Sequence, residues 1–338
     1  MKPVPNVSKR PIAGSIHTRY LIPLLSLALL SAMALVFSVT QGSSGLPLRD
    51  VMNVLIGQGD PLQRTLILDL RLPRTLSAFS TGGLLAVAGA LMQILLRNPL
   101  ADPYILGLSG GAAVGALGAM LLGLGALLVS GSALLGALIA TLLVFGLAHG
   151  SGSWTPSRLL LTGVVVASGW GAIITLMLAL SPPQRLPGML YWLMGDLSYA
   201  QTPWPALVLL ISICVVLTPF GRSLNVLARG PLQAAALGVA VKPLEAGIFF
   251  LASLLTAIAV TTAGSIGFIG LIVPHMLRLV LGNDQRLILP ASALAGGALL
   301  TVADTFARTL IAPEQLPVGV LTALLGVPMF LYLLHRTR

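Results

Sequence analysis

Long stretches without a charged side chain constrain this sequence more than any other feature. The longest, residues 104–157, runs for 54 residues without Asp, Glu, Lys or Arg. Only 8% of the 338 residues are charged, whereas a soluble domain carries about 25%. Because a soluble fold needs a polar surface around its core, lipid must cover this chain. A soluble domain, a disordered chain and a disulfide scaffold are therefore excluded, the last because Cys214 is the single cysteine.

An uncharged stretch of about 20 residues spans a bilayer as a helix. On this basis the sequence predicts an all-α, polytopic membrane protein with ten transmembrane helices. The predicted spans are Tyr20–Thr40, Thr75–Leu96, two within Tyr104–Ser157 that meet near residue 130, Leu159–Leu180, Pro205–Phe220, Ala246–Thr262, a short or irregular segment ending at Leu277, Leu287–Leu310 and Pro317–Leu334. A short helix at the membrane surface is expected within 181–203, where Tyr191, Trp192 and Tyr199 lie.

The distribution of basic residues predicts the orientation. Ten spans place both termini on one side, and cytoplasmic termini put 13 Lys and Arg residues in the cytoplasm and six outside. This agrees with the positive-inside rule and accounts for the net charge of +10 without a nucleic-acid partner. Residues 1–19 are expected to form a cytoplasmic segment, and residues 20–338 a single transmembrane domain in the inner (plasma) membrane.

Motifs for chemistry are scarce. No Gly-x4-Gly-Lys-Ser/Thr loop is present and the chain has three lysines, so it is not expected to hydrolyse nucleotide. The four histidines are scattered without ligand spacing, so neither a metal site nor a cofactor is expected. Asp304 is the one carboxylate expected inside a span, and Arg308, one turn later, predicts an i,i+4 ion pair.

Two alternatives stay open at this point. An ion-coupled secondary transporter would need an intramembrane carboxylate, for which Asp304 is the candidate. An intramembrane protease of the rhomboid type would use the Gly-x-Ser-Gly pattern at 107–110, with Ser109 as nucleophile and His275 as base.

Two long motifs resemble the FecCD family, the permease subunits of ABC importers for iron-siderophores, haem and cobalamin. The first contains Arg71-Leu72-Pro73-Arg74, Gly89-Ala90-Leu91-Met92-Gln93, Arg97-Asn98-Pro99-Leu100-Ala101-Asp102-Pro103 and Leu106-Gly107-Leu108-Ser109-Gly110-Gly111-Ala112. The second contains Gly264-Ser265-Ile266-Gly267-Phe268-Ile269-Gly270-Leu271-Ile272-Val273-Pro274-His275, then Arg278, Asp284, Asp304 and Arg308, and ends in Leu316-Pro317-Val318-Gly319. The resemblance runs from about residue 65 to the C-terminus.

The resemblance implies a transport subunit that is not itself an enzyme. It implies ten helices, a second permease copy, two cytoplasmic ATPase subunits, and a periplasmic or lipid-anchored binding protein that delivers the substrate. The second copy is identical or a paralogue. The cargo is a ferric siderophore, haem or cobalamin, and the motifs do not select among them. Transport would proceed by alternating access, driven by ATP binding to the partner subunits.

The resemblance also implies roles for particular residues. The outer arginines that dock carboxylates of the binding protein match Arg71, Arg74 and Arg308, and arginine forks suit carboxylates. Snorkelling at helix ends is the alternative for these three. The cytoplasmic coupling segment is 221–245, with Leu224, Asn225, Leu227, Arg229, Gly230, Ala236, Leu237 and Gly238 against the ATPase. Here Arg229-Gly230-Pro231 replaces the family's usual Leu-Gly-Glu or similar. The cytoplasmic gate residues are Asn98, Leu100, Thr155 and Ser157.

Overall fold

The computed structural model describes residues 16–42, 46–149, 155–198, 200 and 202–336, and over these residues the regular structure is entirely helical. Seven helices are long and apolar enough to cross a membrane. They are α1 (Ile16–Thr40), the helix 61–95 that ends in α4 (Leu72–Leu95), α6 (Ala126–Ala148), α7 (Pro156–Ala179), α9 (Trp204–Leu227), α11 (Val241–Ala263) and α13 (Gln285–Thr309). Shorter apolar helices are α5 (Leu108–Leu121), α12 (Ile269–Leu281) and α14 (Val318–Arg336).

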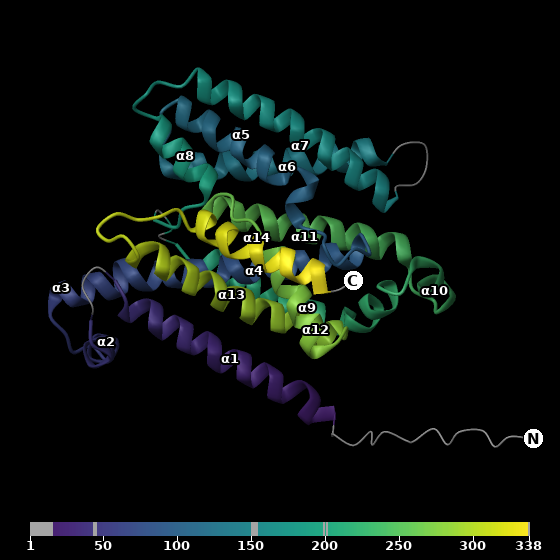
Figure 1. Cartoon of the computed structure of the whole chain (residues 1–338), viewed down its shortest axis with the longest axis horizontal. Coiled ribbons are helices and arrows are strands. Elements are labelled where there is room, and N and C mark those ends of the chain that lie inside the picture. The colour runs from purple at the N-terminus through teal and green to yellow at the C-terminus, as the bar shows by residue number, and fades with distance from the viewer. Residues whose placement is uncertain (1–15, 43–45, 150–154, 199, 201, 337–338) are drawn as a thin grey trace, which may run out of the picture.

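The helices surround α4, which runs through the middle of the molecule (Figure 1). Helix α1 lies along one edge against α13, while α5, α6, α7 and the short α8 (Leu186–Met194) group on the opposite side. The short α2 (Leu48–Leu55) and α3 (Pro61–Arg64) lie at one end of the bundle, and α10 (Pro231–Ala236) projects from the other. The start of α1 and the end of α14 both point toward the end that carries α10.

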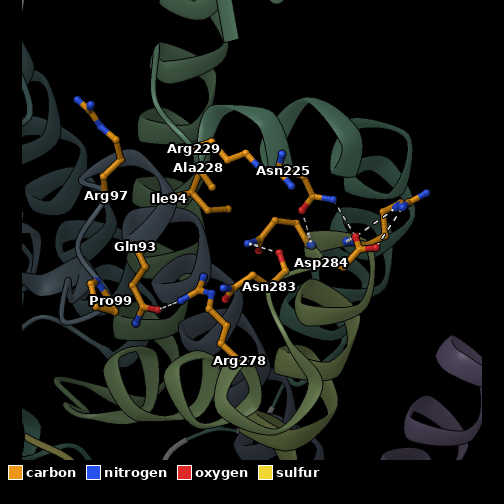
Figure 2. Close-up of a pocket in the computed structure, with 12 residues that line it drawn as sticks. Gln93, Ile94, Arg97, Pro99, Asn225, Ala228, Arg229, Arg278, Asn283 and Asp284 are labelled. Atoms are coloured by element: carbon orange, nitrogen blue, oxygen red, sulfur yellow. Dashed lines mark hydrogen bonds and ion pairs between the residues drawn. The ribbon is translucent and has the colours of Figure 1, made fainter. Parts of the chain in front are cut away.

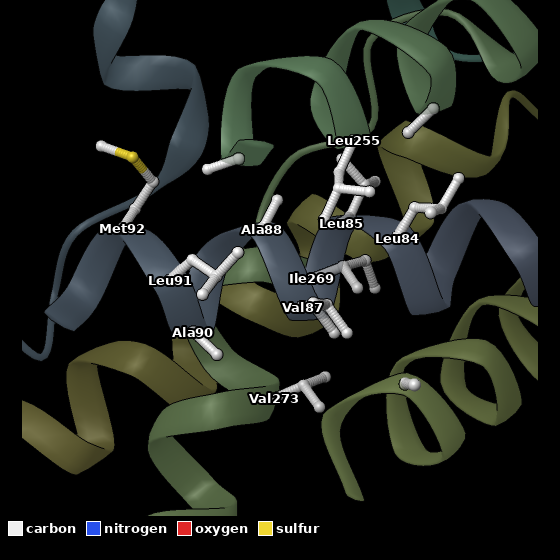
Figure 3. Close-up of a cluster of buried hydrophobic side chains, with 14 of the residues drawn as sticks. Leu84, Leu85, Val87, Ala88, Ala90, Leu91, Met92, Leu255, Ile269 and Val273 are labelled. Carbon is white, nitrogen blue, oxygen red and sulfur yellow. The ribbon is translucent and has the colours of Figure 1, made fainter. Parts of the chain in front are cut away.

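Small residues place α4 at this centre. Its residues from Thr75 to Leu95 are buried, apart from Leu76 and Phe79. Gly82 faces the backbone of Gly296 on α13, and Gly89 faces that of Gly270 on α12. Helices in lipid associate by packing, so small side chains that let backbones touch determine which helices become neighbours. Leu255 of α11 and Ile269 and Val273 of α12 complete the cluster around α4 (Figure 3).

The predicted turn near residue 130 is wrong. Helix α5 ends at Leu121 and α6 begins at Ala126. Gly123 turns the chain with φ of 72°, a conformation that favours glycine. Residues around 130 instead continue as helix α6.

Three helix ends lie beyond their predicted positions. Residues 61–71 were expected outside the membrane helix, but α3 and a π-helical segment, Thr65–Arg71, lead directly into α4. Charges are tolerated there because Arg64 and Asp69 are exposed. Helix α9 continues to Leu227, past the predicted end at Phe220, and α11 begins at Val241 rather than Ala246.

The irregular stretch before α12 and the short helix within 181–203 are confirmed. Gly264 and Phe268, with φ of 69° and 70°, separate α11 from α12, which has only 13 residues. Helix α8 occupies the predicted surface segment. The predicted N-terminal segment lies outside the described residues up to position 15, as does Tyr199.

Gly89→Ala is expected to destabilise the protein, because the added Cβ would overlap the carbonyl oxygen of Gly270, a backbone atom with little room to move. Overpacking of this kind costs about 1–3 kcal/mol. Gly146→Ala on α6 is the matched control, since a Cβ there has no neighbour within 4 Å. The measurement is the temperature at which each purified variant loses its monodisperse peak in detergent. Equal transition temperatures for the two variants would contradict the packing argument.

Candidate functional site

A buried carboxylate organises the end of the bundle that carries α2 and α3. Asp304 of α13 is fully buried and forms salt bridges with two arginines. Arg308 Nε lies 3.1 Å from Asp304 Oδ2, which confirms the predicted i,i+4 pair, and Arg74 Nη2 of α4 lies 2.8 Å from Oδ1. The side chains of Arg74 and Arg308 are 12% and 9% exposed. One carboxylate therefore joins α4 to α13 by pairing with Nε and Nη2 of Arg74 and with Nε of Arg308.

Backbone carbonyls and the Ser38 hydroxyl of α1 accept from further donors of Arg71 and Arg308. Arg308 Nη2 donates to Ser38 Oγ over 2.9 Å and to the Ser38 carbonyl over 3.2 Å. Arg71 Nη1 donates to the Val39 carbonyl over 3.0 Å. Arg74 Nη1 turns outward to Gln315 Oε1, 2.7 Å away. The structure thus brings the three predicted docking arginines together, with their charge directed mainly into the bundle.

The opposite end of the bundle holds a cavity of about 630 Å³ between the ends of α4 and α9 and the corner that joins α12 to α13. Figure 2 shows the side chains that line it. They are Gln93, Ile94, Arg97, Pro99, Asn225, Ala228, Arg229, Arg278, Asn283, Asp284, Gln285 and Arg286. Four arginines and one carboxylate line the cavity, so the wall is strongly basic.

Hydrogen bonds to Asp284 connect the helices at this cavity. Asp284 caps the start of α13 by accepting from Arg286 N over 3.1 Å, and it accepts from Asn225 Nδ2 over 2.8 Å and from Tyr20 Oη over 2.5 Å. Burial raises the pKa of the carboxyl, but hydrogen bonds from Arg286, Tyr20 and Asn225 outweigh it and hold the pKa well below the usual range. The lowered pKa means that these bonds stabilise the fold above the unfolded pKa of about 3.9 and are lost as pH falls below it.

The predicted coupling residues divide into a buried and an exposed set. Leu224 and Leu227 are buried at the end of α9, and Asn225 joins α9 to α13 by accepting from Gln285 N over 2.7 Å. Gly230, with φ of 130°, turns the chain into α10, and Pro231 occupies the first position of that helix. The sequence Arg229-Gly230-Pro231, which replaces the family's usual residues, therefore still forms a sharp turn. Ala236, Leu237 and Gly238 are exposed.

The predicted gate residues lie in two places. Asn98 Oδ1 accepts from Leu100 N over 2.9 Å, which shapes the loop after α4. Thr155 Oγ1 accepts from Arg158 N over 3.3 Å and caps α7, with Ser157 exposed in the next turn. The loop that contains Asn98 shares the basic cavity with the coupling segment through Arg97 and Pro99, whereas Thr155 and Ser157 do not line it. Sequence reasoning missed this shared cavity.

The elements of the alternative proteolytic site are not joined. Ser109 lies in the first turn of α5 and His275 in α12, and no hydrogen bond connects them in the described part of the chain. Among the described residues no three His, Cys, Asp or Glu side chains group as metal ligands would.

Asp304→Asn is expected to lower the stability of the protein by about 3–5 kcal/mol, because it leaves two largely buried arginines without their carboxylate. Asp69→Asn is the control, since Asp69 is exposed near the same end and forms no salt bridge in the described structure. Thermal unfolding in detergent, followed for both variants, checks this. A loss for Asp304→Asn no larger than that for Asp69→Asn would refute the role of the buried pair.

Comparison with known proteins places this geometry in a family. The sequence pattern of the FecCD transport family matches residues 29–336. The hemin transport system permease protein HmuU of Yersinia pestis is 40% identical over 280 residues, which are 80% of this chain and 83% of the relative. The vitamin B12 import system permease protein BtuC of Shigella boydii is 37% identical over 319 residues, 93% and 95% of the two chains.

A solved structure is similar along nearly the whole chain. An inward-facing metal-chelate type ABC transporter superposes with a TM-score of 0.83 and 32% identity, covering 94% of this chain and all of the other. The matched range contains α4, the Asp304 cluster and the basic cavity. The chain belongs to the FecCD transport family, whose members are membrane permeases of ABC transporters.

Proposed function

We propose that this chain is the permease subunit of an ABC importer that carries an iron chelate, such as a ferric siderophore or haem, or cobalamin across the inner membrane. The observation that carries the proposal is the family match over 29–336, joined to relatives named for hemin and vitamin B12. The chain supplies the pathway and no ATP hydrolysis, and it needs no cofactor of its own.

The proposed topology has ten spans with both termini in the cytoplasm. Seven long apolar helices and the shorter α5, α12 and α14 are the ten segments. Support for the orientation comes from the basic residues, which are more numerous at the end that carries α10 than at the end that carries α2. In this orientation the Asp304 cluster faces outward and the basic cavity faces the cytoplasm.

The proposed partners are a second permease copy, two ATPase subunits and a substrate-binding protein. The most exposed apolar side chains of the coupling segment support α10 as the ATPase contact. Leu232 on α10 is 86% exposed and Leu237, directly after that helix, is 70% exposed, and α10 is too short to span lipid. Movement of the coupling segment reaches the gate loop through the cavity that Asn225, Arg229, Arg97 and Pro99 share. Closure of the ATPase dimer would thus drive alternating access.

The test of the function is reconstitution of the permease with its ATPase and binding protein in liposomes. Binding protein loaded with the transported cargo should stimulate ATP hydrolysis and uptake, whereas binding proteins loaded with the other candidate chelates should not. Uphill transport by the permease alone would favour an ion-coupled secondary transporter instead, and peptide-bond cleavage lost in Ser109→Ala would favour the protease.

Leu232→Asp with Leu237→Asp is expected to weaken association with the ATPase roughly tenfold or more, because two apolar contacts are replaced by charges that must be desolvated. Leu62→Asp is the control, since Leu62 is 67% exposed at the opposite end. Co-purification of the ATPase over a dilution series measures the loss. A retained complex would move the coupling contact away from α10.

Arg74→Gln is expected to weaken binding-protein association roughly tenfold if Arg74 docks a carboxylate. Arg49→Gln, an exposed arginine on α2 at the same end, should have little effect. Asp304→Asn separates docking from structure, because it breaks the same ion pair but frees the arginine charge for a partner. An equal loss of affinity in Arg74→Gln and Asp304→Asn would assign Arg74 a structural role only.

A further inference from the structure

The basic cavity carries more positive charge than the protein neutralises. Asp284, the one carboxylate on its described wall, is already bound to Arg286, Tyr20 and Asn225. Arg278 donates to Gln93 Oε1 and to the Ala90 carbonyl, both of which are uncharged. Two further arginines line the cavity, so an anion placed there would find several unneutralised guanidinium groups.

The other two arginines are exposed at the rim. Arg97 lies just after α4 and has a φ of 49°. Its charge interacts with that of Glu245 on α11. The Arg229 side chain forms no hydrogen bond to any described residue, and it lies on the wall between Ala228 and Asn225 in Figure 2. Guanidinium groups bind phosphate oxygens in pairs of parallel hydrogen bonds. Arg229 and Arg278, which both line the cavity, are therefore the candidate ligands for a phosphate group.

A second observation indicates that the ligand also carries a donor. Gln285 lines the cavity and is 2% exposed, and its Oε1 has no hydrogen-bond partner in the described structure. Its Nε2 donates to the Asn283 carbonyl over 3.4 Å, so the oxygen is the amide atom that is left without a partner. Leaving a buried acceptor unpaired costs about 1–3 kcal/mol. A hydroxyl group of a ligand would satisfy it.

Apolar surface continues from the cavity along the bundle. The Arg286 guanidinium lies 5.7 Å from the centre of the Tyr20 ring at the start of α1, and its side chain packs against Gly221 of α9. On these two helices Leu21, Leu25, Val216 and Phe220 are 50–59% exposed. A ligand held by its phosphate in the cavity would have room for acyl chains against such surface.

We propose that the cavity binds the phosphate and hydroxyl groups of an anionic phospholipid headgroup of the phosphatidylglycerol type. Its volume of about 630 Å³ falls within the usual 300–1,000 Å³ of small-molecule sites, and basic pockets between membrane helices bind such headgroups. The phosphate pairs with Arg229 and Arg278, and a glycerol hydroxyl donates to Gln285. Assignment to the cytoplasmic leaflet rests on the proposed topology, but binding itself does not.

The test is lipid binding to the purified full-length permease in detergent, measured by native mass spectrometry. Phosphatidylglycerol should bind more tightly than phosphatidylcholine, with one molecule retained per chain. Arg229→Gln should weaken this binding roughly tenfold, and Gln285→Met should weaken it while keeping the volume of the side chain. Arg222→Gln is the matched control, since Arg222 is exposed on the last turns of α9 and does not line the cavity.

Competition by glycerol 3-phosphate identifies which part of the lipid is recognised. Displacement of phosphatidylglycerol by millimolar glycerol 3-phosphate would support recognition of the headgroup, and binding of glycerol 3-phosphate alone would support the same site with a soluble ligand.

Two results would overturn the proposal. One is an equal affinity for phosphatidylcholine, or an equal loss in Arg222→Gln. The other is weakened association with the ATPase in Arg229→Gln without any lipid bound, which would make the cavity a socket for an acidic side chain of that partner. Neither result depends on transport, so the proposed function is tested separately.

Discussion

Direct backbone contact between α4 and its neighbours is the interaction on which the rest of the structure depends. Lipid solvates apolar side chains as well as another helix does, so the hydrophobic effect does not hold membrane helices together. Gly82 against Gly296 and Gly89 against Gly270 bring α4 into contact with α13 and α12. The same helix then carries Arg74 at one end and Gln93 at the other. Both charged regions are therefore positioned by two glycine contacts.

The sequence predicts the long apolar helices well and their ends less well. The length of an uncharged stretch reflects the thickness of the bilayer that a helix must cross, and bilayer thickness does not depend on tertiary contacts. A turn depends on the conformation of single residues. Gly123 has a positive φ and turns the chain, while Gly131 continues α6, although both stand in similar Gly- and Leu-rich surroundings. Nothing local distinguishes them, which explains the misplaced turn.

In the candidate sites too, contacts between residues close in sequence can be predicted, whereas contacts between distant residues cannot. The pair of Asp304 and Arg308 is one helical turn apart and is readable from spacing alone. The pair of Asp304 and Arg74 joins residues 230 positions apart, and it exists because α4 packs on α13. The basic cavity draws on the ends of four helices, so its arginines appear in the sequence only as unrelated basic positions. Family resemblance supplied a role for Arg229 but not the common location of the four arginines.

The two charged regions differ in how far the protein satisfies them. At the Asp304 end, the carboxylate forms salt bridges with Arg74 and Arg308, and carbonyls of α1 and Gln315 accept from the arginines, so most of their donors are satisfied, although Arg308 Nε has no hydrogen-bond partner among the described residues. At the cavity end, Arg229 and the Gln285 oxygen keep unused hydrogen-bonding capacity. A ligand bound there would contact α9, α12 and α13 at once and would resist their separation. Binding and conformation are linked reciprocally. Any movement of the coupling segment that widens the cavity must therefore lower the affinity for the ligand, and a bound ligand must oppose that movement by the same free energy.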